Sequence, residues 1–541
     1  MLHEHTLLAF DRDLHAEART VLEHSPQPQN LFEVAVILET AGYDDEAARL
    51  LGSDDVFELA RRVSEVVDLY TEAAPVDVAE VPAEIPAIAR RPRKLYRHLS
   101  AGLLARCLLY SVPWLFAIVA LAVSRVSFWS TITTVQFSSA ISLALFVALV
   151  LTGAFIQAFA RRGTFYALQG NQPLLNWTTC WTLGAGAVVS AVVYGATYAV
   201  LEYGLRAYTP NSTKAYLFFG LSISAMLLAL APLFIARAFG FVSLATGAGA
   251  AFVSVGGRAI TVGQFIDPYT AMKVQLGAIS VVVVISLVLD VVVLRHAARP
   301  LDGPSPARVR RPRLAAAATS VSGYAAYGSC FFLLIIVDQL VAGGLWSGGF
   351  SYDNGYELAV GVGLLVLVPT LTYVAASNEV FAGAVQVALA RYRVSEVAAL
   401  REEMSRFYRR HLGALVAVGA ASAGLLLLLG AYAAGAMSIT SRLPTVYGVY
   451  AGALGAYLLL AVGAFNSGLL FSLARPGVPA AATATGAAFS LLLGGGLTAA
   501  LPATWAALAG LLGGTAVFAC WTTAAAHGVF SRFDASYYRA F

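Results

Sequence analysis

The sequence has 541 residues, of which 58% are hydrophobic and only 12% are charged, whereas soluble globular proteins carry about 25% charged residues. This composition excludes an ordinary soluble enzyme or nucleic-acid-binding domain, and it predicts an all-α protein that crosses a membrane many times. The net charge of +4 is unevenly divided, because residues 1–88 hold 19 acidic residues and 5 arginines while the rest hold 12 acidic and 30 basic residues, so an acidic soluble head should precede a basic membrane body.

Residues 1–70 are predicted to form a small helical head in the cytoplasm. The chain begins MLHEHTLLAFDRDLHAEA, which has neither the basic start nor the apolar core of a signal peptide. The stretch 31–52 has apolar residues spaced for one face of two short helices around Gly42. It resembles half a repeat of the tetratricopeptide kind, and one copy cannot bury its own face. A small helical cap and a partner-docking module are both consistent with this pattern.

Residues 71–100 are predicted to link the head to the body. Pro75, Pro82 and Pro86 disfavour regular structure in this stretch. The run RRPRKLYR then places basic charge immediately before the first long apolar run. The linker is therefore expected to end in a basic juxtamembrane segment.

The rest of the chain contains twelve apolar runs of the length, about 20 residues, that a membrane-spanning helix needs. We expect them near residues 104–124, 135–160, 175–201, 215–237, 240–262, 272–294, 316–342, 357–379, 412–437, 445–472, 479–500 and 504–528. The fifth run is rich in glycine and contains Arg258, so a broken or re-entrant helix is the alternative there. Eleven and fourteen spans are the alternative counts.

Basic residues in the short loops give an independent test of this arrangement, because they are retained on the cytoplasmic side. Twelve spans place most of them on one side, namely Arg90–Arg97, Arg161, Arg162, Arg237, Arg295–Arg313, Arg391–Arg410, Arg475, Arg532 and Arg539. The other side holds little more than Arg125, Arg206, Lys214 and Arg442. Both termini are therefore expected in the cytoplasm.

The longest basic connection, residues 295–313, divides the body into two halves. Its proline and glycine content disfavours regular structure. We therefore expect an N-terminal lobe over residues 101–294 and a C-terminal lobe over residues 314–541, with six spans each. Two such lobes facing each other are suited to alternating access.

Sequence motifs for nucleotide, metal and nucleophilic chemistry are missing. The three lysines, Lys94, Lys214 and Lys273, do not follow a glycine-rich loop, which excludes a Walker A motif. No HExxH occurs, and the four cysteines lie singly in apolar runs without metal or disulfide spacing. Asp54 and Asp55 lack the apolar strand that normally presents a sugar-nucleotide metal site, so a glycosyltransferase has little support. We expect no enzyme activity, no metal and no cofactor.

Polar residues inside the spans are the candidates for a substrate path, because each is costly unless it faces protein or water. These candidates are Asp338, Gln339, Asn466, Asp290 and Arg258. For Asp290, at the end of its span, the alternative is a side chain that merely reaches the membrane surface. Asp338 lies deeper in its span, which favours a functional role.

The run that starts at Ser351 is expected to be span eight, which begins after SYDNGYE, kinks at Pro369 and ends at Glu379. Residues 383–411 should then form a cytoplasmic amphipathic helix with Ser395 as a possible N-cap. An anionic membrane surface or a docking partner would suit its charged face, and a plain helical linker is the alternative. The residues expected to dock or gate are Glu379, Arg401, Glu402, Arg406, Arg409 and Arg410.

This stretch resembles PelG, the membrane transporter family of Pel exopolysaccharide systems. The matching residues are Tyr352, Asp353, Pro369, Glu379, Phe381 and Arg401–Met404, and the ending FSRFDASYYRAF is similar to the aromatic tail of the family. That family belongs to the multidrug/oligosaccharidyl-lipid/polysaccharide (MOP) exporter superfamily, whose members have twelve spans in two lobes. The acidic head departs from the family pattern, in which the first span lies close to the N-terminus.

The resemblance implies a secondary transporter that exports a Pel-like polysaccharide across a bacterial cytoplasmic membrane. Its implied partners are a separate cytoplasmic glycosyltransferase (PelF-like), other membrane subunits of an export complex and the lipid bilayer. A lipid-linked oligosaccharide flippase and a cation-coupled multidrug exporter share the fold and remain alternatives. A pyrophosphate-bearing lipid calls for several cationic groups, and the spans supply only Arg258 and Lys273. A non-transporting scaffold of a polysaccharide synthase is the third alternative.

Overall fold

The computed structural model describes residues 14–24, 28, 31–43, 45–73, 100–128, 134–168, 171–260, 267–297, 314–344, 350–391, 397–436 and 443–533. Over these ranges the regular structure is helical, which confirms the expected all-α class. The chain divides into two compact units, Met1–Arg90 and Arg91–Phe541. The 74–99 part of the expected linker, the 298–313 part of the inter-lobe connection, Ser395 and the aromatic tail beyond Phe533 lie outside the described residues. Residues 71–73, expected to begin the linker, are the end of the helix Val56–Ala73.

In the described part of the head, four helices enclose a core of their own. A helix over residues 14–24 is followed by α2 (Leu31–Thr40), α3 (Asp45–Leu50) and α4 (Val56–Ala73). Their apolar faces meet around Leu38 and Leu59, which are fully buried. Gly42 turns the chain between α2 and α3 with a φ of 101°, a conformation that glycine adopts without strain. The two short helices predicted around Gly42 are therefore confirmed.

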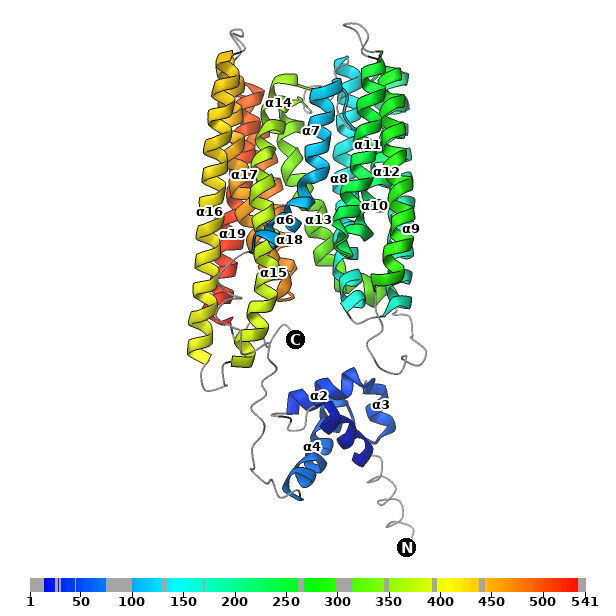
Figure 1. Ribbon diagram of the computed structural model, residues 1–541, viewed down its shortest axis with the longest axis vertical. Coiled ribbons are helices and arrows are strands. Elements are labelled where there is room, and N and C mark those ends of the chain that lie inside the picture. The colour runs from blue at the N-terminus through cyan, green and yellow to red at the C-terminus, as the bar shows by residue number, and fades with distance from the viewer. Residues whose placement is uncertain are drawn as a thin grey trace. The chain divides into compact units, whose positions relative to one another are not determined.

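The body is a bundle of long helices in two groups (Figure 1). The N-terminal lobe consists of α6 (Ala101–Leu108), η1 (Leu109–Ser111), α7 (Val112–Ser124), α8 (Val135–Leu168), α9 (Gln172–Ala199), η2 (Val200–Leu205), α10 (Pro210–Ile235), α11 (Phe239–Ile260) and α12 (Pro268–Ala297). The C-terminal lobe consists of α13 (Leu314–Ala342), α14 (Asn354–Gly363), η4 (Leu364–Val366), α15 (Leu367–Arg391), α16 (Val397–Ala436), α17 (Leu443–Ser472), α18 (Gly477–Leu497) and α19 (Ala503–Ser531).

Among the described residues, eleven helices are long and apolar enough to cross a membrane. The first expected span, which consists of α6, η1 and α7, is not one of these eleven. Pro113 lies in the first turn of α7, where its missing N–H leaves a carbonyl of the preceding turn without its helical partner. The eleven helices and this interrupted one occupy the twelve expected positions.

Two expectations about single spans can be compared directly with the structure. The fifth run is one continuous helix, α11, so the broken or re-entrant alternative is wrong. The eighth span is interrupted by η4, three residues before Pro369, so the helix is irregular near the position of the predicted kink. In both interrupted spans a short 3-10 turn lies just before a proline, because the proline cannot donate the next helical hydrogen bond.

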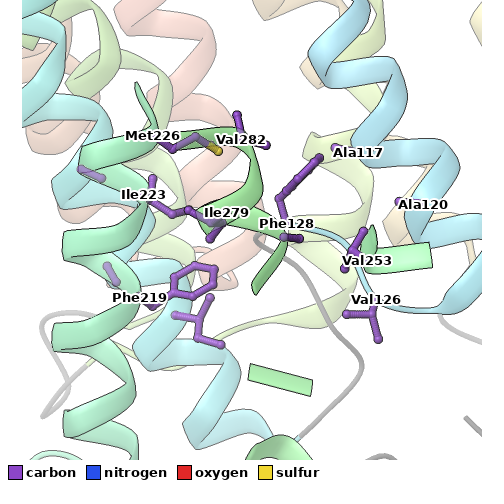
Figure 2. Packing of buried hydrophobic residues seen from close by; sticks show 14 of the residues in the cluster. Ala117, Ala120, Val126, Phe128, Phe219, Ile223, Met226, Val253, Ile279 and Val282 are labelled. Atoms are coloured by element: carbon purple, nitrogen blue, oxygen red, sulfur yellow. The ribbon is translucent and has the colours of Figure 1, made fainter. Parts of the chain in front are cut away.

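Each lobe has its own apolar core. In the N-terminal lobe, Phe128 from the connection after α7 lies among the buried residues Val253, Ile279 and Val282 of α11 and α12 (Figure 2). In the C-terminal lobe, two clusters gather side chains from α13 to α19. Burial within each lobe, rather than between the lobes, therefore supplies most of the packing.

The lobes meet where α8 packs along α13. A Cβ atom on Gly153 would lie 2.6 Å from the carbonyl oxygen of Gly328, and a Cβ on Gly328 would collide with the Gly153 carbonyl. Beside them, Ser329 Oγ donates a hydrogen bond to the Val150 carbonyl at 2.8 Å. Small residues let two membrane helices approach closely enough for such backbone contact. This contact is a seam between the lobes.

The seam is also closed near the two ends of the bundle. At one end Tyr208 Oη donates to the Phe350 carbonyl at 2.8 Å, and at the other Arg162 Nη2 donates to Ser320 Oγ at 3.2 Å. Successive long helices run in opposite directions, so the loops alternate between these ends (Figure 1). We call the end that carries Arg162, Arg295, Arg475 and Arg532 the basic face, and the end that carries Arg125, Arg206 and Lys214 the opposite face.

Replacing Gly328 with valine is expected to destabilise the body by about 1–3 kcal/mol, the usual cost of overpacking a close contact. The added methyl groups have no space beside the backbone of α8. The apparent melting temperature of the purified protein in detergent measures the effect. The matched control is Gly424→Val in α16, where no atom lies within 4 Å of the added Cβ. Equal shifts in the two variants would mean that the lobes do not need this close approach.

Candidate functional site

Asp338 is a fully buried carboxyl near the opposite-face end of α13, with 0% of its surface exposed. Tyr356 Oη donates a hydrogen bond to its Oδ2 at 2.7 Å. Its Oδ1 has no hydrogen-bond partner among the described residues. A charged carboxylate held in this way is costly inside a membrane protein, so the group is stable as a neutral acid or beside a bound cation.

The sequence around Asp353 places Tyr356 in this position. Asp353 is the N-cap of α14, and its side chain accepts hydrogen bonds from the backbone N–H groups of Gly355 and Tyr356 at 2.9 and 3.0 Å. The cap fixes the first turn of the helix, because it satisfies N–H groups that have no partner inside the helix. Tyr356 then reaches from α14 to α13 and contacts Asp338.

Two more groups complete the surroundings of Asp338. Glu357 follows Tyr356 in α14, and Tyr457 of α17 is fully buried with no partner for its hydroxyl among the described residues. The charge of Asp338 acts on both of them. The C-terminal lobe therefore holds two acids and two tyrosine hydroxyls close together, which we call the Asp338 cluster. Its chemistry suits the binding and release of a proton or a monovalent cation.

Asn466 lies in a different part of the C-terminal lobe. Its Oδ1 accepts a hydrogen bond from Tyr408 Oη at 3.1 Å, and its Nδ2 donates one to Thr523 Oγ1 at 2.8 Å. These contacts join α16, α17 and α19 near the basic face, and the Asn466 side chain is fully buried. The structure therefore does not bring Asn466 together with Asp338, which lies toward the opposite face.

The other expected path residues are also dispersed. Gln339 follows Asp338 in α13 and is buried. Asp290 and Arg258 belong to the N-terminal lobe, where Asp290 is buried near the basic-face end of α12 and Arg258 is exposed near the opposite-face end of α11. Only Asp338 and Gln339 are neighbours. A shared substrate path along all five residues stays a prediction.

Glu379 forms an ion pair between the lobes. Its Oε1 lies 3.4 Å from Nη1 of Arg237, which is in the turn between α10 and α11, and the two side chains are 29% and 66% exposed. Arg237 has a φ of 56°, a left-handed conformation that costs a non-glycine residue about 1–2 kcal/mol. The pair lies beside Cys107 of α6, on whose thiol both charges act. A gating role for Glu379 stays a prediction.

The region predicted as one helix, residues 383–411, is described as parts of two helices, and residues 392–396 lie outside the described ranges. Its first part is the end of α15, and Val397 begins α16, a single 40-residue helix that continues into the ninth span. Leu400 and Met404 are buried against α15, α17 and α19. The C-terminal lobe itself therefore covers the apolar face of this segment, which corrects the expectation of a helix lying on an anionic membrane surface.

The charged face of the same segment remains exposed at the basic face. Arg406 and Arg409 both pair with Glu402, at 3.4 and 3.5 Å, and all three side chains are more than half exposed. Arg401 and Glu403 are also on this part of α16. Such exposed ion pairs contribute little to stability, so these groups can rearrange to meet a partner at small cost.

Sequence reasoning did not identify three residues of these sites. Tyr356 was noted only as part of the SYDNGYE segment, and Arg237 only as one of the basic loop residues. Tyr457 carried no signal that distinguishes it among the 24 tyrosines. The available signal for Tyr356 was the N-cap at Asp353, since a cap fixes which side chains occupy the first turn. The partner of Arg237 lies 142 positions away in the chain and gives no local pattern.

Removing the inter-lobe charge pair is expected to expose Cys107. This thiol is 1% exposed beside Glu379, and a Glu379→Gln variant loses the attraction that holds α15 to the α10–α11 turn. In a background where the other three cysteines are serine, the rate of Cys107 alkylation by a maleimide should rise severalfold. Glu402→Gln is the matched control, because it breaks exposed pairs within one helix. An unchanged rate in Glu379→Gln would contradict a gating role for the pair.

No protein-family model and no curated protein matches the chain. Solved structures do share its fold. A MATE transporter carrying the P26A mutation aligns with a TM-score of 0.55 and 12% identity over 82% of this chain and 98% of that one. A MOP superfamily transporter from Pyrococcus furiosus aligns with a TM-score of 0.51 and 14% identity, covering 81% and 98% of the two chains. The MATE transporter ClbM in complex with Rb⁺ aligns with a TM-score of 0.52 and 13% identity, covering 80% and 94%.

These comparisons show that the body has the fold of MATE transporters in the MOP superfamily. The superfamily fold that the PelG resemblance implied is therefore confirmed. The PelG assignment itself receives no support from them, because identities of 12–14% show the fold alone.

Proposed function

We propose that this protein is a secondary transporter that exports a polysaccharide or oligosaccharide across a bacterial cytoplasmic membrane by alternating movement of its two lobes. The MATE-like fold supports the transporter class, since the solved structures that share it are membrane transporters. The observation that carries the proposal is the fully buried Asp338, whose Oδ1 has no partner among the described residues. A carrier without a nucleotide motif needs such an ionisable group to couple to an ion gradient.

Coupling at Asp338 would act through the helices that hold it. Asp338 is on α13, the helix that forms the seam with α8, and Tyr356 connects it to α14. Binding of a proton or cation removes the cost of the buried charge, and its release restores that cost. The equilibrium between two arrangements of α13 would shift by the difference in binding free energy. ClbM, which shares the fold, has been solved in complex with Rb⁺, and this supports the proposal that the coupling species here is a cation.

The substrate is proposed from the resemblance to PelG around Tyr352, Pro369 and Glu379. A cation-coupled exporter of small organic molecules is the second candidate, and it is favoured by the MATE transporters among the structural neighbours. A lipid-linked oligosaccharide flippase would require more cationic groups in the spans than Arg258 and Lys273. Polymer secretion by cells and dye efflux from vesicles separate the first two candidates.

The proposed partner is a cytoplasmic glycosyltransferase that supplies the polymer. The exposed charged face of α16, around Glu402, Arg406 and Arg409, is the proposed docking surface on the body. The head, with its own enclosed core and net acidic charge, is the proposed second contact. Twelve spans with basic loops on one side support a cytoplasmic position for this face.

Substitution of Asp338 with asparagine is expected to reduce transport at least tenfold, because the amide cannot take up or release a proton. Two assays apply, namely polymer secreted by cells and efflux of a fluorescent cation from vesicles with a pH gradient. Asp353→Ser is the matched control, since it removes a nearby acid and keeps an N-cap residue. Transport at the wild-type rate by correctly inserted Asp338→Asn protein, in both assays, would rule out coupling at this carboxyl.

Deletion of residues 1–88 is expected to leave measurable transport and to weaken recovery of the glycosyltransferase with the membrane protein. The body is a compact unit of its own and contains every span. The two readouts are polymer secretion and co-purification of the glycosyltransferase. Complete loss of both would support the scaffold alternative, in which the head assembles the synthase and the body transports nothing.

A further inference from the structure

Asp290 is a second buried carboxyl, located in the N-terminal lobe. It lies in α12, seven residues before the end of the helix at the basic face, and only 5% of its surface is exposed. Both carboxyl oxygens are buried and have no hydrogen-bond partner among the described residues. The alternative that this side chain merely reaches the membrane surface is therefore wrong.

At the basic face, Tyr166 near the end of α8 shares an apolar cluster with Leu294 of α12, and its hydroxyl accepts a hydrogen bond from Arg162 at 3.4 Å. Helices α9, α10 and α11 also pack against α12. Their titratable groups are Cys180, Tyr194 and Tyr198 of α9, Lys214 and Tyr216 of α10, and Arg258 of α11. Cys180 is exposed on the outside of the bundle. The other five lie toward the opposite-face ends of their helices, roughly 25 Å or more from the level of Asp290 at 1.5 Å per residue.

The charged groups near the basic face do not pair with Asp290 either. Arg295 is five positions further along α12, which places it on a different side of the helix, and it is exposed. Arg237, in the α10–α11 turn, pairs with Glu379 of the other lobe. Lys273 of α12 is seventeen residues away, about 25 Å along the axis. Asp290 is buried, and no opposite charge among the described residues compensates for the burial of its carboxyl group.

Ser286 lies one helical turn before Asp290 on the same face of α12. Its side chain is fully buried, and its hydroxyl has no partner among the described residues. Serine hydroxyls inside helices commonly bond to the carbonyl four residues earlier, as Ser422 and Ser467 do here. A carboxyl and a hydroxyl therefore share one enclosed helix face with unused hydrogen-bonding capacity.

A bound metal ion does not fit this face. Ions such as Ca²⁺ take about six to eight oxygen ligands, whereas Asp290 and Ser286 offer three oxygen atoms between them. Among the described residues there is no group of three His, Cys, Asp or Glu side chains that could hold a metal. An unpaired carboxylate at this depth costs several kcal/mol, and protonation removes that cost.

We infer that Asp290 is a proton-binding site of the N-terminal lobe, separate from the Asp338 cluster. A proton from water at the basic face, about 10 Å away along α12, adds to one carboxylate oxygen and gives a neutral carboxylic acid; the same O–H bond breaks when movement of the lobe admits water. The molecule then exchanges protons at two places, one in each lobe and toward different faces. The inference that Asp290 binds a proton does not depend on the proposed function, whereas any use of that proton in transport rests on it.

Labelling with dicyclohexylcarbodiimide tests this site, because the reagent reacts with protonated carboxyl groups in apolar surroundings. The full-length protein in lipid nanodiscs is treated over a pH series, and the modified fraction of each acid is measured by mass spectrometry. Asp290 should be labelled, with a fraction that falls at least tenfold as the pH rises through its titration.

Asp267 provides an internal control in the residue before α12. Hydrogen bonds from the side chain and the backbone N–H of Thr270 lower the pKa of this exposed carboxyl. It is therefore ionised near neutral pH and should stay unlabelled there. Asp338→Asn should lose its own label and leave that of Asp290 unchanged.

Absence of label on Asp290 at every pH at which the protein remains monodisperse, or a label that does not change with pH, would overturn the inference. Neither result bears on the transporter proposal, which depends on Asp338 and on the transport assays. Conversely, failure of transport coupling at Asp338 would leave a pH-dependent label on Asp290 as evidence for this site.

Discussion

The hydrocarbon part of a membrane offers no hydrogen-bond partner, and the rest of this structure depends on that constraint. Helices meet it for the backbone, because each N–H and C=O pairs within its own segment. Hydroxyl side chains meet it by bonding to the carbonyl four residues earlier, as Thr152, Thr246 and Thr483 do. Among the described residues, few buried polar side chains lack a hydrogen-bond partner, and the carboxyls of Asp290 and Asp338 are among them.

The same constraint explains how the two lobes contact each other. Apolar side chains gain little from packing on each other when lipid is the alternative, so close backbone approach and polar contacts become more important. Gly153 and Gly328 supply the first kind of contact, and Arg237 with Glu379 supplies the second. These two contacts lie on different helix pairs, α8 with α13 and the α10–α11 turn with α15. A change at one of them can therefore alter the angle between the lobes without disrupting either core.

The first span takes part in both lobes. Its half toward the opposite face, α7, packs on α11, while its half toward the basic face, α6, packs on α15 of the other lobe. The break at η1, just before Pro113, permits this change of neighbours within one span. Cys107 of α6 is next to the Arg237–Glu379 pair, so this half of the span lies beside the polar contact between the lobes.

Hydropathy, charge and proline act locally along the chain, so the membrane class, the positions of the spans, the acidic head and the irregular turn before Pro369 could be predicted from the residues alone. The same reasoning identified Asp338 and Asp290 as unusual residues in apolar runs. The hydrogen bond from Tyr356 to Asp338, the ion pair of Arg237 with Glu379, and the contacts of Asn466 with Tyr408 and Thr523 became visible only in the folded chain. Such pairs join helices far apart in the chain, and no local pattern encodes which of them become neighbours.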